Sequence, residues 1–260
     1  MEQKQLFNEN VIFYDKRRPT YGDKIYGDII ARCGLNKNSS VVEVGCGTGQ
    51  ATRPFLDMGC KVVALEIGAD LAEFTRLKYK DYKNLNVFNM PFEDFEAANG
   101  GVDLVYSATA FHWIKSDTAY NKALNMLKPG GYLAAWWNTP RVSEDNVELE
   151  NEIDEIYQKY MNEKYQSTDD SSYKKRCERI QGEFSQYGFK NVSLDLYYEY
   201  RTFTADEYIE LLHTYSDHMM LEDTIRAAFF NEIHNAISKH KIIRIKDTID
   251  LHMGRKTSVY

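Results

Sequence analysis

Residues 41–52 read VVEVGCGTGQAT, an apolar run followed at once by three glycines at alternate positions. The run is short and rich in valine, which is typical of a strand buried in a parallel sheet. Gly45, Gly47 and Gly49 allow the backbone to turn sharply and to approach a ligand closely. The pattern predicts a strand, a turn and a helix whose first N–H groups face that ligand.

The ligand predicted for this turn is not a dinucleotide. The G-x-G-x-x-G fingerprint would place its third glycine at position 50, where the chain has Gln50. Glu43 stands just before the turn, and no Lys or Arg occurs between residues 41 and 52 to offset its charge beside a pyrophosphate. The carboxylate therefore favours a ligand with a cationic amine. A tight turn without any ligand is the structural alternative.

A second carboxylate, Glu66, ends the next apolar run, KVVALE at 61–66. At the end of a second strand, a carboxylate can accept hydrogen bonds from both hydroxyls of an adenosine ribose. Enzymes that bind NAD share this feature, so Glu66 by itself indicates only an adenosyl ligand. A solvated residue at a helix start is the structural alternative.

Strand and helix signals alternate from residue 20 to residue 133, which predicts a doubly wound α/β fold. The expected strands are 41–44, 61–66, 85–89, 102–107 and 132–138, with KPGG at 128–131 as a turn before the last of them. The expected helices are 21–33, 49–58, 69–80 and 116–127.

The pattern changes after Pro140, where amphipathic helices are expected at 144–164, 171–187, 205–214 and 222–240. Strictly alternating apolar residues predict one strand at 192–200 and a last strand from 243. The sequence thus predicts a mostly parallel seven-stranded sheet with an antiparallel last strand and a helical cap. We expect one integrated domain, with an N-terminal lid and first helix (1–36), a cofactor-binding core (37–140), and helical insertions plus the last two strands (141–260).

The bulk composition argues against several classes of protein. A formal net charge of -7 disfavours broad contact with a nucleic-acid backbone. No apolar run approaches the roughly 18 residues of a membrane span, and the polar N-terminus lacks the apolar core of a signal peptide. The four cysteines form no CxxC pair, so neither a disulfide framework nor a zinc site is expected, and a reducing cytoplasm fits best. The sequence does not indicate the oligomeric state.

Five segments resemble, in order and spacing, the motifs of class I S-adenosylmethionine-dependent methyltransferases. They are VVEVGCGTGQ, ALEIG, MPFEDF, VDLVYSATAFHWI and LKPGGYLAAWW. The resemblance covers about residues 14 to 138 and is strongest to the small-molecule group that includes trans-aconitate methyltransferase. It implies S-adenosylmethionine as the cofactor, which has a ribose and an amine but no phosphate, and methyl transfer to a small acceptor.

The resemblance also assigns cofactor contacts residue by residue. Gly45, Cys46 and Gly47 would touch the methionine part, Glu66 would hold the ribose, and Ile67 would pack on the adenine. Glu43 stands where the family often has Asp and would orient the loop or the cofactor's ammonium group. The expected cofactor-binding residues are Tyr14, Arg18, Glu43, Gly45, Cys46, Gly47, Gln50, Glu66, Ile67, Phe92, Glu93 and Ala108.

The acceptor is expected beside the end of the fourth strand, where SATAFHWI begins at residue 107. His112 is the candidate catalytic residue, as a general base or as a hydrogen-bond partner of the acceptor; packing beside Trp113 at a helix start is the alternative. The expected acceptor-binding residues are Tyr21, Phe111, His112, Trp113 and Asn138.

The segment YDKRRPTY at 14–21 is expected to be a lid in which Arg18 pairs with a carboxylate of the cofactor or of an acidic acceptor, with Arg201 as a second candidate. An exposed basic N-terminus is the alternative. Three other functions stay open: a methyltransferase acting on a macromolecule, a protein that binds S-adenosylmethionine without catalysis, and a nicotinamide-dependent enzyme. The Asn-Pro-Pro-Tyr type of sequence typical of enzymes that methylate nucleic-acid amines is absent after the fourth strand, which favours a small acceptor.

Overall fold

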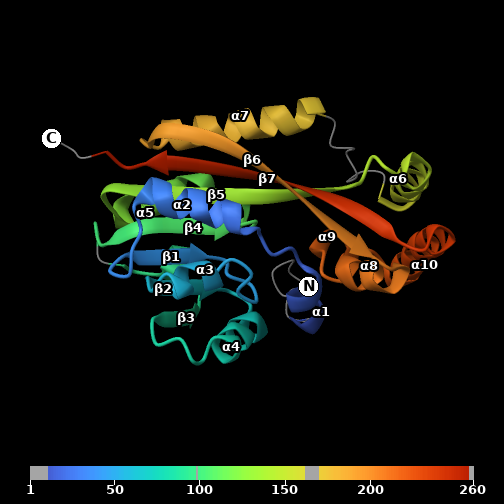
Figure 1. The fold of residues 1–260 in the computed structure, drawn as a ribbon, viewed down its shortest axis with the longest axis horizontal. Coiled ribbons are helices and arrows are strands. Elements are labelled where there is room, and N and C mark those ends of the chain that lie inside the picture. The colour runs from blue at the N-terminus through green and yellow to red at the C-terminus, as the bar shows by residue number, and fades with distance from the viewer. Residues whose placement is uncertain (1–10, 98, 162–169, 258–260) are drawn as a thin grey trace. The chain divides into compact units, whose positions relative to one another are not determined.

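The structure is a computed structural model that describes residues 11–97, 99–161 and 170–257. The first ten residues of the expected lid and the end of the helix expected at 144–164 lie outside the described residues. The central element is a seven-stranded sheet with the strand order β3-β2-β1-β4-β5-β7-β6 (Figure 1). This order confirms the doubly wound fold expected from the alternating pattern.

The strands run with the directions that the sequence predicts. Strand β1 pairs in parallel with β2 and β4, β2 pairs in parallel with β3, and β4 with β5. In Figure 1, β7 points opposite to β1 and β4 and supplies the antiparallel addition. The bounds are β1 Ser40–Val44, β2 Lys61–Glu66, β3 Leu85–Asn89, β4 Val102–Ala108, β5 Leu127–Val142, β6 Lys190–Phe203 and β7 Ile243–Arg255.

The helices lie close to their expected positions. The α-helices are α1 Val11–Arg17, α2 Asp23–Cys33, α3 Arg53–Asp57, α4 Ala69–Lys78, α5 Ser116–Met126, α6 Val147–Met161, α7 Asp170–Gln186, α8 Ala205–Leu212, α9 Ser216–Met219 and α10 Asp223–His240. Two short 3-10 helices, η2 Phe92–Asp94 and η3 Phe111–Trp113, follow β3 and β4.

Two expectations about local structure were wrong. The helix expected from residue 49 begins only at Arg53, because Gly49 has a left-handed φ of +82° that ends the turn, and Pro54 then suits the first turn of a helix. KPGG is not a turn ahead of a strand but part of β5. Gly130 there has a φ of +87°, and its N–H donates to the carbonyl of Lys256 at 2.7 Å.

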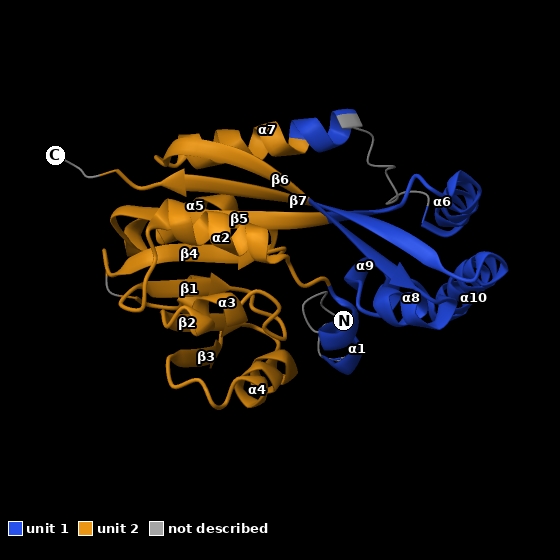
Figure 2. Cartoon of the chain, viewed as in Figure 1, with its two compact units in different colours: residues 1–18, 139–175, 198–248 blue, residues 19–138, 176–197, 249–260 orange. Residues whose placement is uncertain are grey.

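The chain divides into two compact units, shown in different colours in Figure 2. The first comprises residues 1–18, 139–175 and 198–248, and the second comprises residues 19–138, 176–197 and 249–260. The core of the first unit is formed by α6, α8 and α10, whose apolar side chains include Ile153, Leu212 and Phe229. None of the helices in the described part of the chain combines the length and apolarity of a membrane span.

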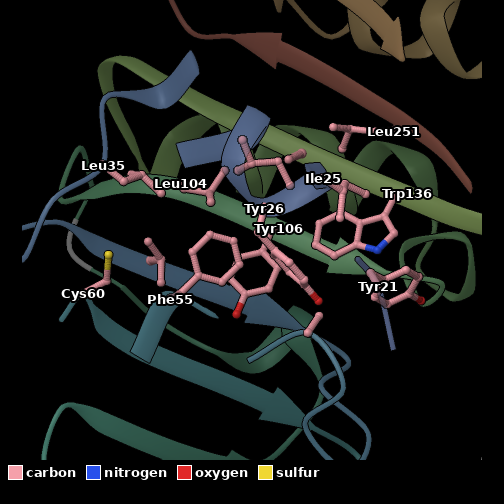
Figure 3. Packing of buried hydrophobic residues seen from close by; sticks show 14 of the residues in the cluster. Tyr21, Ile25, Tyr26, Leu35, Phe55, Cys60, Leu104, Tyr106, Trp136 and Leu251 are labelled. Atoms are coloured by element: carbon pink, nitrogen blue, oxygen red, sulfur yellow. The ribbon is translucent and has the colours of Figure 1, made fainter. Parts of the chain in front are cut away.

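The second unit holds β1 to β4 and has helices on both faces of its sheet. Ile25 and Ile29 of α2 and Phe55 of α3 pack on one face together with Tyr106 and Trp136 of the sheet (Figure 3). The rings of Tyr106 and Trp136 stack with centroids 5.8 Å apart. On the other face, α5 and α7 cover Val42, Val105 and Leu133. This arrangement brings the C-terminal ends of β1, β2 and β4 to a common edge of the sheet.

Candidate active site

The glycine turn after β1 depends on backbone conformations that favour glycine. Gly45, Gly47 and Gly49 have φ angles of +70°, +59° and +82°. A Cβ atom at Gly45 would lie 2.4 Å from the Cβ of Ala110, which lies in the connection after β4. The turn is held from α4 as well, since the Thr75 hydroxyl donates to the carbonyl of Gly47 at 2.8 Å. The turn is therefore a fixed backbone surface at the C-terminal edge of the sheet.

Glu66 ties this turn to the end of β2. One carboxylate oxygen accepts a hydrogen bond from the N–H of Gly47 at 2.8 Å, and the other accepts from the N–H of Gly68 at 2.8 Å. The side chain is only 7% exposed, and its burial raises the pKa of Glu66 against the lowering effect of these N–H donors. Each carboxylate oxygen keeps a further lone pair for a ligand hydroxyl.

The residue after Glu66 presents an apolar surface beside it. Ile67 is 37% exposed at the end of β2. A buried carboxylate next to an exposed aliphatic side chain fits a ribose and a base, and no phosphate-binding cation comes from the glycine turn itself. The residues present at this edge fit S-adenosylmethionine on these grounds.

Glu43 is buried and bonded to two hydroxyl groups of the protein. It is 1% exposed and accepts hydrogen bonds from the hydroxyls of Thr52 at 2.6 Å and Tyr106 at 3.0 Å. Burial, with a smaller contribution from the nearby charge of Glu66, raises the pKa of Glu43 to about 7 against the lowering effect of these two hydrogen bonds. Of the two roles expected for Glu43, this geometry favours holding the loop, because the carboxylate links β1, β4 and the residue that precedes α3.

The other expected cofactor residues of the second unit differ in exposure. Cys46 and Phe92 are buried, Gln50 and Ala108 are half-buried, and Glu93 is exposed. Burial raises the pKa of the Cys46 thiol well above its ordinary value, so this cysteine is a neutral packing group. Cofactor contacts by these five residues stay predictions.

The connection after β4 contains a residue that the sequence analysis missed. Thr109 has a φ of +57°, a strained conformation for a β-branched residue and one that is often found at functional sites. Its N–H donates to the carbonyl of Trp136 at 2.8 Å, and its hydroxyl lies 3.1 Å from the hydroxyl of Tyr21. The expected acceptor residue Tyr21 is thus placed at the end of β4. Only the strained φ angle, which the sequence does not show, singles out Thr109.

A cavity of about 380 Å³ lies beside this connection, between η3, α5, α7 and the end of β5. It is lined by Phe111, His112, Ile114, Ser116, Ala119, Tyr120, Trp137, Arg176, Arg179, Ile180 and Glu183. The expected acceptor residues Phe111 and His112 are therefore part of its wall, whereas Trp113 and Asn138 are not. Tyr120, Trp137 and Arg176 were not predicted, because they come from separate elements.

His112 is held in one protonation form by Trp137. The indole N–H of Trp137 donates to Nδ1 of His112 at 2.9 Å, and an indole nitrogen can only donate. The neutral imidazole must then carry its proton on Nε2. Burial of the ring, with a smaller contribution from the positive charge of Arg176, lowers the pKa of His112 to about 4. Part of the side chain reaches solvent, which moderates the shift, but the ring is neutral at pH 7 in either case.

The expected lid residues Tyr14 and Arg18 belong to the first unit. The Arg18 guanidinium lies over the rings of Tyr14 and Tyr215, and it donates to the carbonyl of Thr214 at 2.6 Å. Its Nε is buried and has no hydrogen-bond partner within the described part of the chain, which suits the expected binding of a carboxylate; that role stays a prediction. Arg201, the second candidate, is paired with the buried Asp247 by both ends of its guanidinium.

Comparison with known proteins identifies the domain that carries this site. Residues 42–135 match the family described as methyltransferase domain. An uncharacterized methyltransferase of Schizosaccharomyces pombe is 22% identical over 215 residues, which are 82% of this chain and 79% of that protein. Residues 42–135 therefore form a class I S-adenosylmethionine-dependent methyltransferase domain.

Another relative matches over a shorter range, and two solved structures match over most of the chain at lower sequence identity. Malonyl-[acyl-carrier protein] O-methyltransferase of Enterobacter lignolyticus is 34% identical over 41% of each chain. A protein of Anaeromyxobacter dehalogenans described as a type II methyltransferase has a TM-score of 0.66 at 18% identity, covering 93% of this chain and 99% of that one. Phosphoethanolamine N-methyltransferase 2 of Haemonchus contortus, solved with S-adenosylhomocysteine, has a TM-score of 0.59 at 12% identity, covering 99% and 61%.

The buried carboxylate of Glu43 makes the stability of the methyltransferase depend on pH. Its folded-state pKa lies above the ordinary value of 4.5, so between these values the folded chain keeps a proton that the unfolded chain has lost. This group's contribution is complete below pH 4.5 and falls as the pH rises toward 7, by at most about 1.4 kcal/mol per pH unit. Glu43→Gln has no such proton, so it does not lose this contribution. The unfolding free energy of the variant minus that of wild type should therefore increase from pH 5 to pH 7, as measured by urea unfolding. The exposed-site variant Glu93→Gln serves as control, and a pH-independent difference for Glu43→Gln would contradict the assignment.

The hydrogen bond from Trp137 favours the neutral imidazole of His112, so we expect it to contribute to the low pKa of that ring. Trp137→Phe removes the donor to the neutral ring, so the pKa of His112 should rise by about half a unit to one unit. The titration can be followed by NMR of the imidazole protons, with His112→Gln to assign the signal. Trp136→Phe is a matched control, because its buried indole N–H has no hydrogen-bond partner. An equal shift in both variants would show that packing, and not this hydrogen bond, sets the pKa.

Removal of the Glu66 carboxylate is expected to weaken cofactor binding. Glu66→Ala should lower the affinity for S-adenosylhomocysteine by about 1–3 kcal/mol, since the ribose hydroxyls and the N–H of Gly47 lose a partner. Calorimetry measures the affinity, and circular dichroism verifies that the variant is folded. Unchanged affinity in folded protein would exclude a ribose contact by Glu66.

Proposed function

We propose that this methyltransferase transfers the methyl group of S-adenosylmethionine to a small molecule that binds in the 380 Å³ cavity beside His112. The proposal rests on one observation: the cofactor turn and the cavity are bordered by the same short segment after β4. Ala110 abuts Gly45 of the cofactor turn, and the next two residues, Phe111 and His112, line the cavity. A volume of this size falls within the range of small-molecule sites.

Methyl transfer requires little acid–base chemistry from the protein. The cofactor supplies a methyl group on a sulfonium with a good leaving group, so rate acceleration can come from alignment and exclusion of water. With its proton on Nε2 and Nδ1 occupied by Trp137, His112 serves better as a hydrogen-bond donor than as a base. We therefore assign His112 the role of orienting an oxygen of the acceptor through its Nε2–H.

The polar groups of the cavity restrict what it binds. Arg176 and Arg179 contribute guanidinium groups, and the Glu183 carboxylate accepts from Tyr120 at 3.1 Å and from Arg179. Apart from His112 and Ser116, the rest of the wall is aromatic or aliphatic. This lining suits a compact acceptor with an apolar body and polar ends, and it offers no surface for a duplex or a folded protein.

Two other functions fit less well. A macromolecular substrate would call for an open, charge-complementary surface, and the net charge of -7 opposes nucleic acid. Binding of the cofactor without catalysis would leave the cavity unexplained. The related methyltransferases differ in the acceptors for which they are named, a malonyl group on a carrier protein in one and phosphoethanolamine in another, so their names do not indicate the acceptor of this chain. A cytoplasmic location stays an expectation.

Filling the cavity tests the proposal. Ser116 lines the cavity from the first residue of α5, so Ser116→Phe should raise the KM for an accepted small molecule about tenfold or more. The affinity for S-adenosylhomocysteine should be unchanged. Thr118→Phe on the same helix is the matched control, because Thr118 is not part of the cavity wall.

The acceptor is sought with a panel of small acids, phenols and amines, tested beside tRNA and histone-like peptides by transfer of a labelled methyl group. The proposal predicts turnover of at least one small molecule that Ser116→Phe impairs. Methylation of a macromolecule alone, or equal activity of Ser116→Phe and Thr118→Phe, would overturn it while leaving cofactor binding intact.

A further inference from the structure

Three buried side chains of different chemistry meet behind the wall of the cavity. Cys177 comes from α7, and Asp250 and His252 come from β7. One thiol, one carboxylate oxygen and one imidazole nitrogen lie within 4.8 Å of one another. Asp250 and His252 are 0% exposed. Such groups are costly to bury unless something satisfies them.

The hydrogen bonds in the structure satisfy this group only in part. Nε2 of His252 lies 3.1 Å from one oxygen of Asp250, and Arg176 donates to the other oxygen at 2.7 Å. Nδ1 of His252 is buried and has no hydrogen-bond partner among the residues that the structure describes. An unsatisfied buried polar atom costs about 1–3 kcal/mol, so its presence at this place requires an explanation.

The chemistry of the three groups selects one class of ligand. Thiolate and imidazole favour zinc-like ions over magnesium or calcium, which prefer sites made of oxygen alone. Around a tetrahedral zinc ion, the ligand atoms would lie about 3.3–3.6 Å apart, so the observed limit of 4.8 Å requires closure by about 1 Å through side-chain rotation. The thiolate and the carboxylate would together neutralise a divalent ion.

We infer that Cys177, Asp250 and His252 bind one zinc-type divalent ion that links α7 to β7. On binding, the Cys177 thiol loses its proton to solvent, and a water molecule completes the coordination. Arg176 keeps its contact with Asp250, as hydrogen-bonded partners of ligating carboxylates commonly do. The site lies outside the cofactor edge and goes beyond methyl transfer, since neither the glycine turn nor the acceptor cavity needs it.

The proposed ion is a structural link with a connection to the cavity wall. The ring of Trp137, which lines the cavity, packs on the ring of His252 with centroids 5.7 Å apart. Arg176 lines the cavity and contacts Asp250 as well. Loss of the ion should therefore lower the melting temperature and loosen α7.

Metal content and cobalt substitution test this site directly. Full-length protein prepared without a metal-affinity column should contain about one zinc per chain by elemental analysis. After removal of zinc by a chelator, added Co²⁺ should produce a thiolate-to-cobalt charge-transfer band and raise the melting temperature. Cys177→Ser should lose the band.

The other cysteines provide the control. A variant with Cys33, Cys46 and Cys60 replaced by alanine keeps Cys177 as its single thiol and should retain the band. Cys33→Ser alone serves the same purpose if the triple variant does not fold, because Cys33 lies on α2 and outside the group. Absence of the band and of stoichiometric zinc in wild type would overturn the inference, as would a band that survives Cys177→Ser.

Discussion

The pair of hydrogen bonds that Glu66 accepts is the interaction on which the cofactor edge depends. With one oxygen on the N–H of Gly47 and the other on the N–H of Gly68, this carboxylate fixes the glycine turn relative to the end of β2. Neither N–H would otherwise find a partner in the strands on either side. The turn in turn contacts Ala110 so closely that only glycine fits at position 45. The buried side chain of Glu66 thus connects the cofactor edge, through the glycine turn, to the segment after β4 that forms part of the cavity wall.

Charge balance explains why this edge suits a cationic cofactor. Two carboxylates, Glu43 and Glu66, are buried, and the charge of Glu66 disfavours the ionised form of Glu43. Burial favours the protonated form of both, while hydrogen-bond donors favour the ionised form. A ligand that brings positive charge but no phosphate relieves this repulsion, whereas a dinucleotide would add to it. S-adenosylmethionine, with its sulfonium and ammonium groups, meets this requirement.

The sequence predicted the features that depend on local pattern. Short valine-rich runs and the spacing of glycines are readable because a buried parallel strand and a tight turn each need particular residue types. The face of the sheet on which Glu43 lies can also be predicted from the sequence, since alternation along β1 places it on the same face as the buried Val41. The hydrogen-bond partner of His112 could not be predicted, because Trp137 lies on the next strand and the contact depends on tertiary packing. Cys177 and His252 likewise come together only through the sheet, so their spacing in the sequence shows no metal-ligand pattern.

The division into two units has a consequence for how the chain acquires its fold during synthesis. Neither unit is one continuous stretch, and the boundaries at 138/139, 175/176, 197/198 and 248/249 fall inside β5, α7, β6 and β7. Ile249, Leu251 and Met253 of β7 belong to the same core cluster as Ile25 of α2. The cofactor-binding unit therefore cannot complete its core until residues 249–253 have left the ribosome. Chains with consecutive domains commonly fold one domain at a time during synthesis, but this unit cannot fold completely before β7 has been synthesised. Until then, the early strands of the nascent chain stay exposed to aggregation.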